Sequence, residues 1–242
     1  VYMSALVMGV SHVPGVGHAV ARRFALGGLK VGIMGRQIAK LEESKAAIIS
    51  DVPGAQISCA AVDCTDADAL KIAVQAFESE FGTPKCLVYN ASARPFPPQE
   101  VAELSVERLK EDHDVCVAGF LSAVQLVLPS FRAAGEGCIL YTGATASLRG
   151  SKRFGSFASA KCAARALTQS LAKELAPEGV HVAHVVVDGM VDMPIIRGFT
   201  SADMPDDRLL DTTSIAETYW SLYQQDKRCW TFELDIRPSL AE

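Results

Sequence analysis

The stretch YTGATASLRGSKRFGSFASAK, residues 141–161, is the segment around which the rest of the chain is interpreted. Its apolar start and small-residue middle predict a buried strand that ends in a turn, followed by a helix that carries Lys161. Phe157 precedes Lys161 by four residues, so the two side chains share one face of that helix. A proton-transferring enzyme built this way would need a hydroxyl at position 157, where this chain has a phenyl ring.

The composition predicts one folded domain without a nucleic-acid partner. The chain has 242 residues, of which 49% are hydrophobic, enough for one large α/β core. A net charge of −5 gives no general attraction to nucleic acid or to an anionic membrane. The longest apolar run, residues 115–128, is too short to span a bilayer, and no signal-peptide pattern is present. We therefore expect a cytoplasmic protein with no membrane partner.

The seven cysteines favour free thiols over a disulfide framework or a metal centre. They are scattered along the chain, with no Cys-x-x-Cys spacing and no histidine at ligand spacing nearby. Most lie inside apolar runs, which is typical of buried thiols in a reducing compartment. We expect no metal site.

Short apolar runs that alternate with helical periodicity predict a parallel sheet between helices. Expected strands lie at 5–8, 30–34, 56–62, 87–89, 137–142, 180–187 and 229–236. Expected helices lie at 17–26, 37–50, 66–81, 105–131, 151–176 and 214–225, the fourth with a break near Asp114. Most strands are apolar on both faces, as in a sheet covered on both sides. The predicted fold class is a Rossmann-type doubly wound α/β sheet of about seven strands, in one domain over residues 1–242.

A glycine-bearing turn follows the first expected strand and opens the first helix. Gly9, Gly15 and Gly17 would let the backbone approach a pyrophosphate at the helix amino terminus, although an ordinary strand-to-helix turn has the same pattern. Asp63 and Asn90 end the third and fourth strands, at the edge where open α/β sheets bind ligands. Each could be a plain turn residue; together they favour a dinucleotide site.

Arg36 follows the second strand, where a cofactor ribose would lie. An acidic residue there favours a 2′-hydroxyl, whereas an arginine favours a 2′-phosphate and hence NADP(H) over NAD(H). The alternative is a solvated arginine at a helix start.

The order of these motifs resembles the short-chain dehydrogenase/reductase family over essentially the whole chain. The resemblance rests on the glycine turn, Gly-Arg36, Asp63, Asn90-Ala-Ser, the Thr-Gly-Ala strand end, the lysine-bearing helix and Asp188-Gly. It implies a Rossmann sheet, an NAD(P)(H) cofactor and a carbonyl, alcohol or enoyl substrate. It also implies these cofactor-binding residues: Gly9, Ser11, Gly15, Val16, Gly17, Arg36, Asp63, Cys64, Asn90, Ala91, Lys161, Gly189 and Val191.

The catalytic end departs from that family's pattern. Counted from Lys161, the usual tyrosine is Phe157, the usual serine is Ala144 and the usual asparagine falls at Cys116. Losing a proton-donating side chain typically costs ~10²–10⁴ in rate, and losing an oxyanion donor a further ~10²–10³. Thr145 is the nearest substitute for the serine, although a turn hydroxyl bonded to the backbone is the plainer interpretation.

Two positions beside the expected nicotinamide also differ. Asp188 replaces the family's usual proline, and Met193 its usual threonine. The turn from Gly9 to Gly15 is longer than the common pattern, a feature shared with the enoyl-acyl-carrier-protein reductases. The tyrosine of that branch, seven residues before the lysine, would fall at Phe154, so it restores no acid.

Three functions stay open at this stage. The first is an NADP(H)-binding oxidoreductase with a small carbonyl or enoyl substrate, in which Lys161 contacts the cofactor ribose and Lys161 and Thr145 are the catalytic candidates. The second is a catalytically silent nucleotide-binding or scaffold protein, and the third a protein that has lost the nucleotide as well. The second half of the fourth expected helix is apolar almost all round, so it should be buried or lie at an interface. The family resemblance implies dimers or tetramers, so we expect a homodimer or homotetramer.

Overall fold

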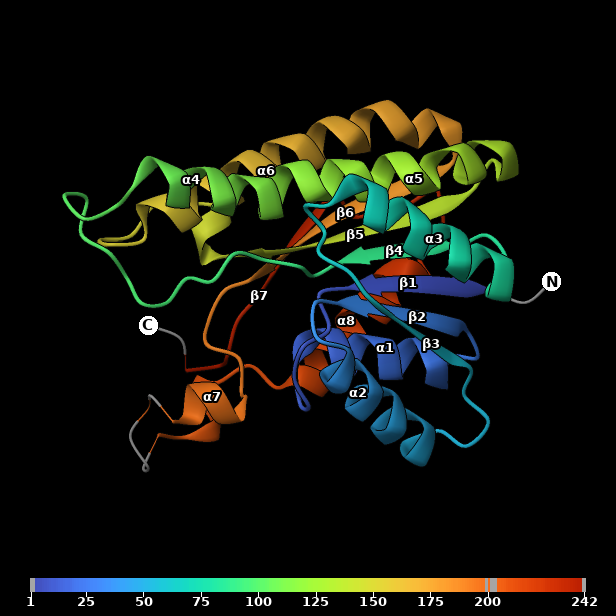
Figure 1. Ribbon diagram of the computed structural model, residues 1–242, viewed down its shortest axis with the longest axis horizontal. Helices are drawn as coiled ribbons and strands as arrows, with labels where there is room; N and C mark the ends of the chain where they lie inside the picture. Colours follow the sequence, from blue (N-terminus) through green and yellow to red (C-terminus); the bar gives the residue numbers. More distant parts are fainter. Residues whose placement is uncertain (1–2, 199, 201–203, 241–242) are drawn as a thin grey trace.

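Seven parallel strands form the centre of the computed structural model, which describes residues 3–198, 200 and 204–240 (Figure 1). Their order is β3-β2-β1-β4-β5-β6-β7. The order reverses direction between β1 and β4, the switch point at which ligands bind in open α/β sheets. The predicted doubly wound Rossmann-type sheet is confirmed. The strands are β1 (Ser4–Met8), β2 (Lys30–Gly35), β3 (Ile57–Ala61), β4 (Cys86–Tyr89), β5 (Gly137–Ala144), β6 (Val180–Val187) and β7 (Glu233–Ile236).

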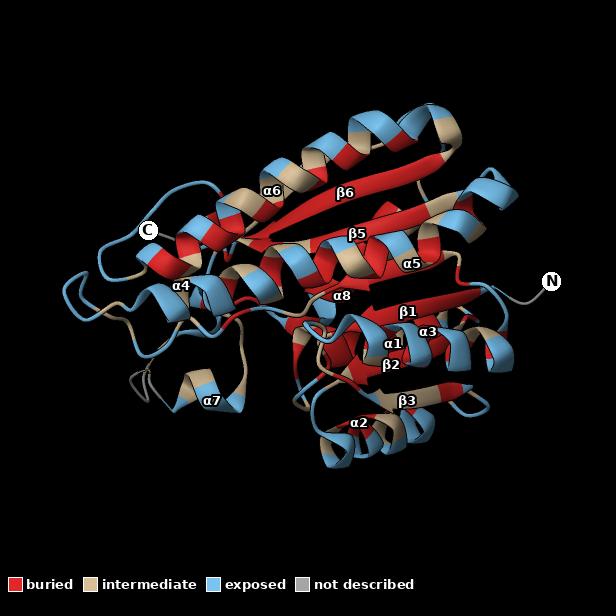
Figure 2. Ribbon diagram, turned by 45° about the horizontal axis from the view of Figure 1, so that its top comes forward, coloured by how far each residue is buried: buried red, intermediate tan, exposed pale blue. Residues whose placement is uncertain are grey.

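Helices cover both faces of the sheet, and each face buries its own apolar core. One layer contains α1 (Val16–Leu26), α2 (Ile38–Asp51) and α8 (Thr212–Tyr223). The other contains α3 (Ala67–Phe81), α4 (Val106–His113), α5 (Gly119–Ala134) and α6 (Gly155–Leu175). Figure 2 shows buried strands between helices whose outward faces are exposed, as the apolar runs predict. The short α7 (Pro194–Arg197) lies outside these layers, and 3₁₀ turns occupy Thr145–Ser147, Ala176–Glu178 and Asp206–Arg208.

The expected break in the fourth helix is a π-helical turn over Asp114–Ala118, which joins α4 to α5. Among the described residues, the run Val106–Ala134 is the one helix long and apolar enough to cross a membrane by length and composition. Its inward side chains, among them Phe120, Val124 and Phe131, pack into the core beneath the sheet. That packing identifies a core helix of the fold.

Two expected boundaries are wrong. The last strand begins at Glu233 instead of 229, because Trp230 stacks on His181 with ring centroids 5.0 Å apart and Thr231 bonds to Gln225 in a turn. Apolar alternation in 229–232 therefore reflects this packing and not a strand. Helix α6 begins at Gly155 instead of 151, since Arg153 has φ 71°, which a right-handed helix does not allow.

All described strands belong to this one sheet, and the described α-helices other than α7 form its two covering layers. The single domain expected over 1–242 stays a prediction, because residues 1–2, 199, 201–203 and 241–242 lie outside the described residues.

Candidate functional site

A cleft of about 610 Å³ opens where the carboxyl ends of β1 to β4 meet. The glycine turn after β1, the loop after β4 and the residues that follow β2 and β3 form its walls. Lys161, Thr145, Gly189 and Val191, expected at the same site, are not among its lining residues. The structure thus brings the nucleotide half of the predicted site together and leaves the catalytic half outside the cleft. The predicted residues that line it are Gly9, Ser11, Gly15, Val16, Gly17, Arg36, Asp63, Cys64, Asn90 and Ala91.

The glycine turn runs so close to the loop after β4 that Gly9 has no room for a side chain. Gly9 has φ +88°, and a Cβ there would lie 2.3 Å from the Ala91 backbone nitrogen. A Cβ on Gly17 would lie 2.9 Å from the Gly9 carbonyl oxygen. That same oxygen accepts a hydrogen bond of 2.9 Å from the Asn90 side-chain amide. Asn90 therefore ties the turn to β4 and shapes a backbone cradle.

The amino terminus of α1 faces this cradle without a capping side chain. Its cap residue is Gly15, no side chain accepts from the first turn, and that turn contains no acidic residue. The first N–H groups of a helix have no intrahelical partner, and the helix dipole favours an anion beside them. Glycines that leave space and an uncapped helix end are what a dinucleotide pyrophosphate requires, so the residues present fit that group.

Basic side chains stand at the end of the cleft near β2. Arg36 is exposed, lines the cleft and makes no hydrogen bond or ion pair in the described part of the chain. His12, in the glycine turn, bonds through Nδ1 to the Lys40 ammonium at 3.2 Å. Burial, then Lys40 and Arg94, hold the pKa of His12 below its usual value, so the ring is neutral and Lys40 is the donor. This end can accept a phosphate.

Asp63, expected to face the adenine, uses its carboxylate locally. One oxygen accepts from the Thr65 backbone N–H at 2.9 Å and from its hydroxyl at 2.8 Å. The Thr65 backbone bond is the main cause that holds the pKa of Asp63 below its usual value. The carboxylate is ionised and closes a turn at the cleft wall.

Lys161 is buried beneath the cleft instead of lining it. The residue is 2% exposed, and its ammonium donates to the Thr142 carbonyl oxygen at 2.9 Å. The Tyr141 and Phe157 ring centroids lie 5.0 and 5.9 Å from Nζ. Burial lowers the pKa of Lys161, and the two aromatic rings offset part of that cost. Phe157 thus packs on the ammonium where the family's tyrosine would present its hydroxyl.

Five hydroxyl-bearing side chains lie near Lys161 in the sequence, and each has a hydrogen-bond partner inside the protein. Thr145 donates to the Asp188 carboxylate, and Tyr141 donates to the Cys116 carbonyl oxygen at 3.1 Å. None of the five lines the cleft. These five hydroxyls are therefore engaged inside the protein, and none of them stands in the cleft in place of the missing tyrosine and serine. The other pairs are Thr142 with Tyr219, Ser147 with the Ala144 N–H, and Ser156 with Asp112.

Cys116 occupies the asparagine position inside the π-helical turn. It is fully buried, and its sulfur accepts a long hydrogen bond of 3.5 Å from the Ala93 N–H. A thiol lacks both the carbonyl oxygen and the amino group of a carboxamide. Met193, at the usual threonine position, does line the cleft with a thioether that donates no hydrogen bond.

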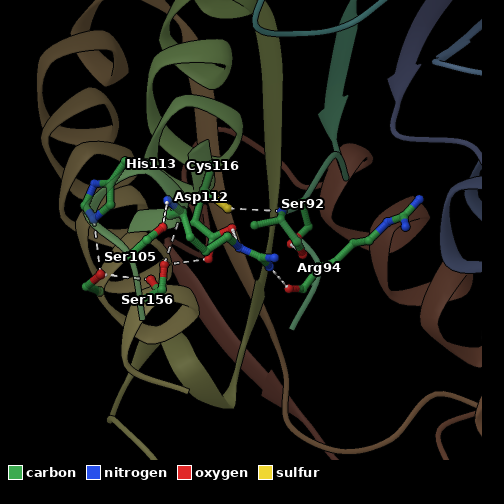
Figure 3. A network of polar contacts seen from close by, with 10 residues as sticks. Ser92, Arg94, Ser105, Asp112, His113, Cys116 and Ser156 are labelled. Carbon is green, nitrogen blue, oxygen red and sulfur yellow. Dashed lines mark hydrogen bonds and ion pairs between the residues drawn. The ribbon is translucent and has the colours of Figure 1, made fainter. Parts of the chain in front are cut away.

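The sequence did not single out Arg94, Arg108 and Asp112, which also line the cleft. Figure 3 shows Arg94 and Asp112 in a polar network between the loop after β4, helix α4 and helix α6. Arg108 bonds to both of them. Asp112 is 4% exposed and accepts from the Arg108 Nε at 2.8 Å and from the Ser156 hydroxyl at 2.7 Å. Arg108 and Asp112 are an i,i+4 pair on α4, which their spacing could have indicated. Their bonds to Arg94 and to Ser156 depend on tertiary packing, so no local sequence signal marks those. Ser156 points toward α4, away from the face that Phe157 and Lys161 share.

Phe157 lines a second, smaller cavity of about 20 Å³ beside the cleft. Arg94, Arg108 and Asp112 line both spaces, so the two are neighbours. Pro95, Pro97 and Leu104 supply apolar walls. Among the described residues no group of three His, Cys, Asp or Glu side chains is placed to hold a metal ion.

Comparisons with known proteins agree with this geometry. The family model for short chain dehydrogenases matches residues 4–202. An uncharacterized oxidoreductase of Staphylococcus saprophyticus is 31% identical over 234 residues, which are 97% of this chain and 96% of that protein. A short-chain dehydrogenase from Rhodopseudomonas palustris is 30% identical with a TM-score of 0.81, over 98% of each chain. An alcohol dehydrogenase from the archaeon Thermococcus sibiricus, complexed with 5-hydroxy-NADP, is 25% identical with a TM-score of 0.86, over 100% of this chain and 99% of that one.

Proposed function

This chain belongs to the short-chain dehydrogenase family, and we propose that it binds NADP(H) in the cleft as an oxidoreductase-type protein with a small carbonyl or enoyl substrate. The main support is the uncapped amino terminus of α1 beside glycines that have no room for a side chain. When bound, the dinucleotide would supply a hydride. The residues of the chain would hold and orient it, with Gly189 and Val191 beside the nicotinamide and Cys64 near the adenine.

The preference for NADP(H) over NAD(H) is part of the proposal. Arg36 makes no hydrogen bond or ion pair among the described residues and would pair with a 2′-phosphate, while Lys40 adds a second positive charge beside His12. An adenosine ribose that carries only hydroxyls would give neither side chain a phosphate to bind.

The chemistry left to such a protein is weak. Positions 157 and 144 lack the tyrosine and serine hydroxyls that would donate a proton and stabilise the oxyanion. Loss of the tyrosine alone raises the barrier by roughly 3–5 kcal/mol, at about 1.4 kcal/mol per tenfold in rate. Lys161 would contact the cofactor ribose once binding brings the ribose to its ammonium, and Thr145 would act only after leaving Asp188. Hydride transfer would then depend on positioning.

A second candidate is a nucleotide-binding or scaffold protein without turnover. It is favoured by the internal partners of all five neighbouring hydroxyls. Both candidates use the same cleft. The seven free thiols agree with a cytoplasmic location, which stays a prediction.

Thermal unfolding with NADPH and NADH tests the binding step. At ligand concentrations about 100 times the Kd, NADPH should stabilise the protein by about 2.7 kcal/mol, a rise of several degrees in Tm. NADH should give a clearly smaller rise, and Arg36→Gln should remove the difference. Equal shifts for both ligands in the wild type would contradict the NADP(H) preference, and no shift with either would contradict nucleotide binding.

A turnover assay separates the two candidates. NADPH oxidation above background on a panel of carbonyl and enoyl compounds supports the oxidoreductase. Binding without turnover, together with a Phe157→Tyr, Ala144→Ser double variant that stays inert, supports the silent protein. A double variant that gains activity would show that the two lost hydroxyls alone limit the chemistry.

A further inference from the structure

Arg94 combines a backbone carbonyl oxygen that is held by Arg108 with an exposed cationic side chain. It lies in the loop after β4, and its guanidinium makes no hydrogen bond or ion pair in the part of the chain that the structure describes. Figure 3 shows this side chain extending away from the polar network instead of joining it. The bond to its carbonyl oxygen fixes where this side chain leaves the loop, and its own torsions can adjust to a ligand.

The Arg94 backbone is held by a chain of hydrogen bonds that reaches α6. Arg108 donates to the Arg94 carbonyl oxygen and, through Nε, to Asp112 at 2.8 Å. Ser156 donates to the other oxygen of Asp112 at 2.7 Å. Asp112 is buried, so these charge-assisted bonds are shielded from water and hold Arg108 firmly.

The acidic side chains nearby leave the charge of Arg94 unmatched. Asp112 is occupied by Arg108 and Ser156, and Glu111 and Asp114 line the same cleft without pairing with Arg94. The glycine turn lines the same cleft as Arg94. The Arg94 charge is close enough to His12, in that turn, to contribute to the lowered pKa of the ring. A ligand anion between the glycine turn and the loop after β4 would satisfy this cation.

We propose that Arg94 is a cofactor-binding residue whose guanidinium contacts the dinucleotide pyrophosphate from the loop after β4. Arg108, Asp112 and Ser156 are positioning residues that act through the Arg94 backbone. The inference rests on the proposed dinucleotide binding and adds a cation to the backbone cradle. A guanidinium suits this task because it donates two parallel hydrogen bonds to phosphate oxygens.

Two fragments of the cofactor separate the subsites. ADP-ribose carries the pyrophosphate without a 2′-phosphate, and adenosine 2′-monophosphate carries the 2′-phosphate without a pyrophosphate. Arg94→Gln should weaken ADP-ribose binding by about tenfold to a hundredfold and leave adenosine 2′-monophosphate unchanged. Arg36→Gln should do the reverse. Arg149→Gln, at an exposed arginine that does not line the cleft, is the matched control and should change neither.

The positioning role is tested by a double-variant cycle. Ser156→Ala should weaken ADP-ribose binding by about threefold to tenfold in the wild-type background and have no further effect in Arg94→Gln. Ser156→Thr, which keeps the hydroxyl, should restore the affinity. A general loss of structure would weaken binding equally in both backgrounds, so equal effects overturn the positioning role.

The outcomes distinguish this inference from the proposed function. If the wild type binds ADP-ribose and Arg94→Gln binds it equally well, the Arg94 contact is wrong while the nucleotide site stands. If Arg94→Gln weakens adenosine 2′-monophosphate instead, the contact is to the other phosphate and the inference is overturned. If the wild type binds neither fragment nor NADPH, the inference falls together with the proposed function. Tm values of all variants verify that each one is folded.

Discussion

At the scale of single residues, Gly9 has two reasons to be a glycine, a positive φ and a close backbone neighbour, whereas Gly28 has only the positive φ. Both have φ near +90°, where an L side chain is strained, +88° and +86° respectively. A Cβ on Gly28 would meet nothing within 4 Å, whereas one on Gly9 would lie 2.3 Å from the Ala91 nitrogen. The close approach of the glycine turn to β4 is therefore specific to Gly9.

We predict that Gly28→Ala lowers the free energy of unfolding by about 1–2 kcal/mol, the usual cost of an alanine with positive φ. Gly9→Ala should cost distinctly more, because the loop after β4 must also move. It should also weaken NADPH binding, which Gly28→Ala should leave intact. Urea denaturation and ligand titration of both variants measure this. Equal losses of stability would mean that the overlap at Ala91 relaxes freely.

His184 is a buried base whose protonation opposes folding. Burial lowers its pKa to about 4, although Glu233 bonds to Nδ1 at 2.9 Å and favours the charged form. The nearby Lys161 and Arg165 also lower it. Its Nε2 is buried without a partner among the described residues. Because Nδ1 donates to a carboxylate, the neutral ring carries its proton there, and Nε2 has a bare lone pair.

This histidine predicts acid sensitivity with a definite sign. In the unfolded chain its pKa is near 6.5, so between pH 6.5 and 4 the unfolded state binds a proton that the folded state excludes. Stability should therefore fall as the pH falls through this window, by about 2 kcal/mol from this group between pH 7.5 and 5. Urea denaturation at both pH values measures the loss. His184→Asn, which retains an N–H donor for Glu233, should show a correspondingly smaller pH dependence; an unchanged one would assign the loss to other groups.

At the scale of elements, the π-helical turn Asp114–Ala118 is braced from the sheet. Tyr89 in β4 donates to the Val115 carbonyl oxygen at 2.6 Å, and Tyr141 in β5 donates to that of Cys116 at 3.1 Å. The two rings stack with centroids 5.8 Å apart. The strands thus fix the turn that carries Cys116 and, through Ala93, the loop that carries Arg94.

We predict that Tyr141→Phe lowers the free energy of unfolding by about 0.5–1.5 kcal/mol, the usual net value of one hydrogen bond. Amide hydrogen exchange should quicken in the π-helical turn more than in α3, which makes no contact with that hydroxyl. Tyr223→Phe is the control, since its hydroxyl meets only the sulfur of Met3, and it should leave exchange in the turn unchanged. Uniform acceleration across both helices would contradict a local brace.

At the scale of the whole molecule, the sequence predicts those parts of the site that the parallel strand order is sufficient to bring together. Carboxyl ends of parallel strands share one edge, so the residues after β1, β2, β3 and β4 gather in one cleft once the strands are recognised. Arg108 and Asp112 pair along α4 at a spacing that the sequence does show. Their bonds to the Arg94 carbonyl oxygen and to Ser156 on α6 depend on tertiary packing, which no local pattern encodes. The burial of Lys161 and the internal partners of Thr145 were equally hidden, because a hydroxyl's partner is a property of tertiary packing. The alternation of Trp230 with Phe232 has the pattern of a strand, but Trp230 is apolar because it packs on His181.

The outward face of the long helix bears on the expected homodimer or homotetramer. Val117, Leu121 and Leu128 lie at helical spacing on one stripe of the run Val106–Ala134, beside the side chains that enter the core. Leu121 is exposed, whereas Val117 and Leu128 are half-buried and pack partly against the core. An apolar stripe of this kind on a folded surface is typical of a contact with another chain. The same stripe explains why the helix is apolar almost all round although only one side packs on the sheet.

We predict that the protein self-associates through this stripe and that Leu121→Glu shifts it toward the monomer. Leu121 is 37% exposed, so a glutamate there is hydrated in the monomer, while in an interface it would bury an unpaired charge. Ile72→Glu on α3, at a side chain that is 68% exposed, is the control and should leave the assembly unchanged. Size-exclusion chromatography with light scattering measures the mass of each variant. A wild type that is monomeric at high concentration, or an assembly that Leu121→Glu leaves intact, would show that α5 faces solvent.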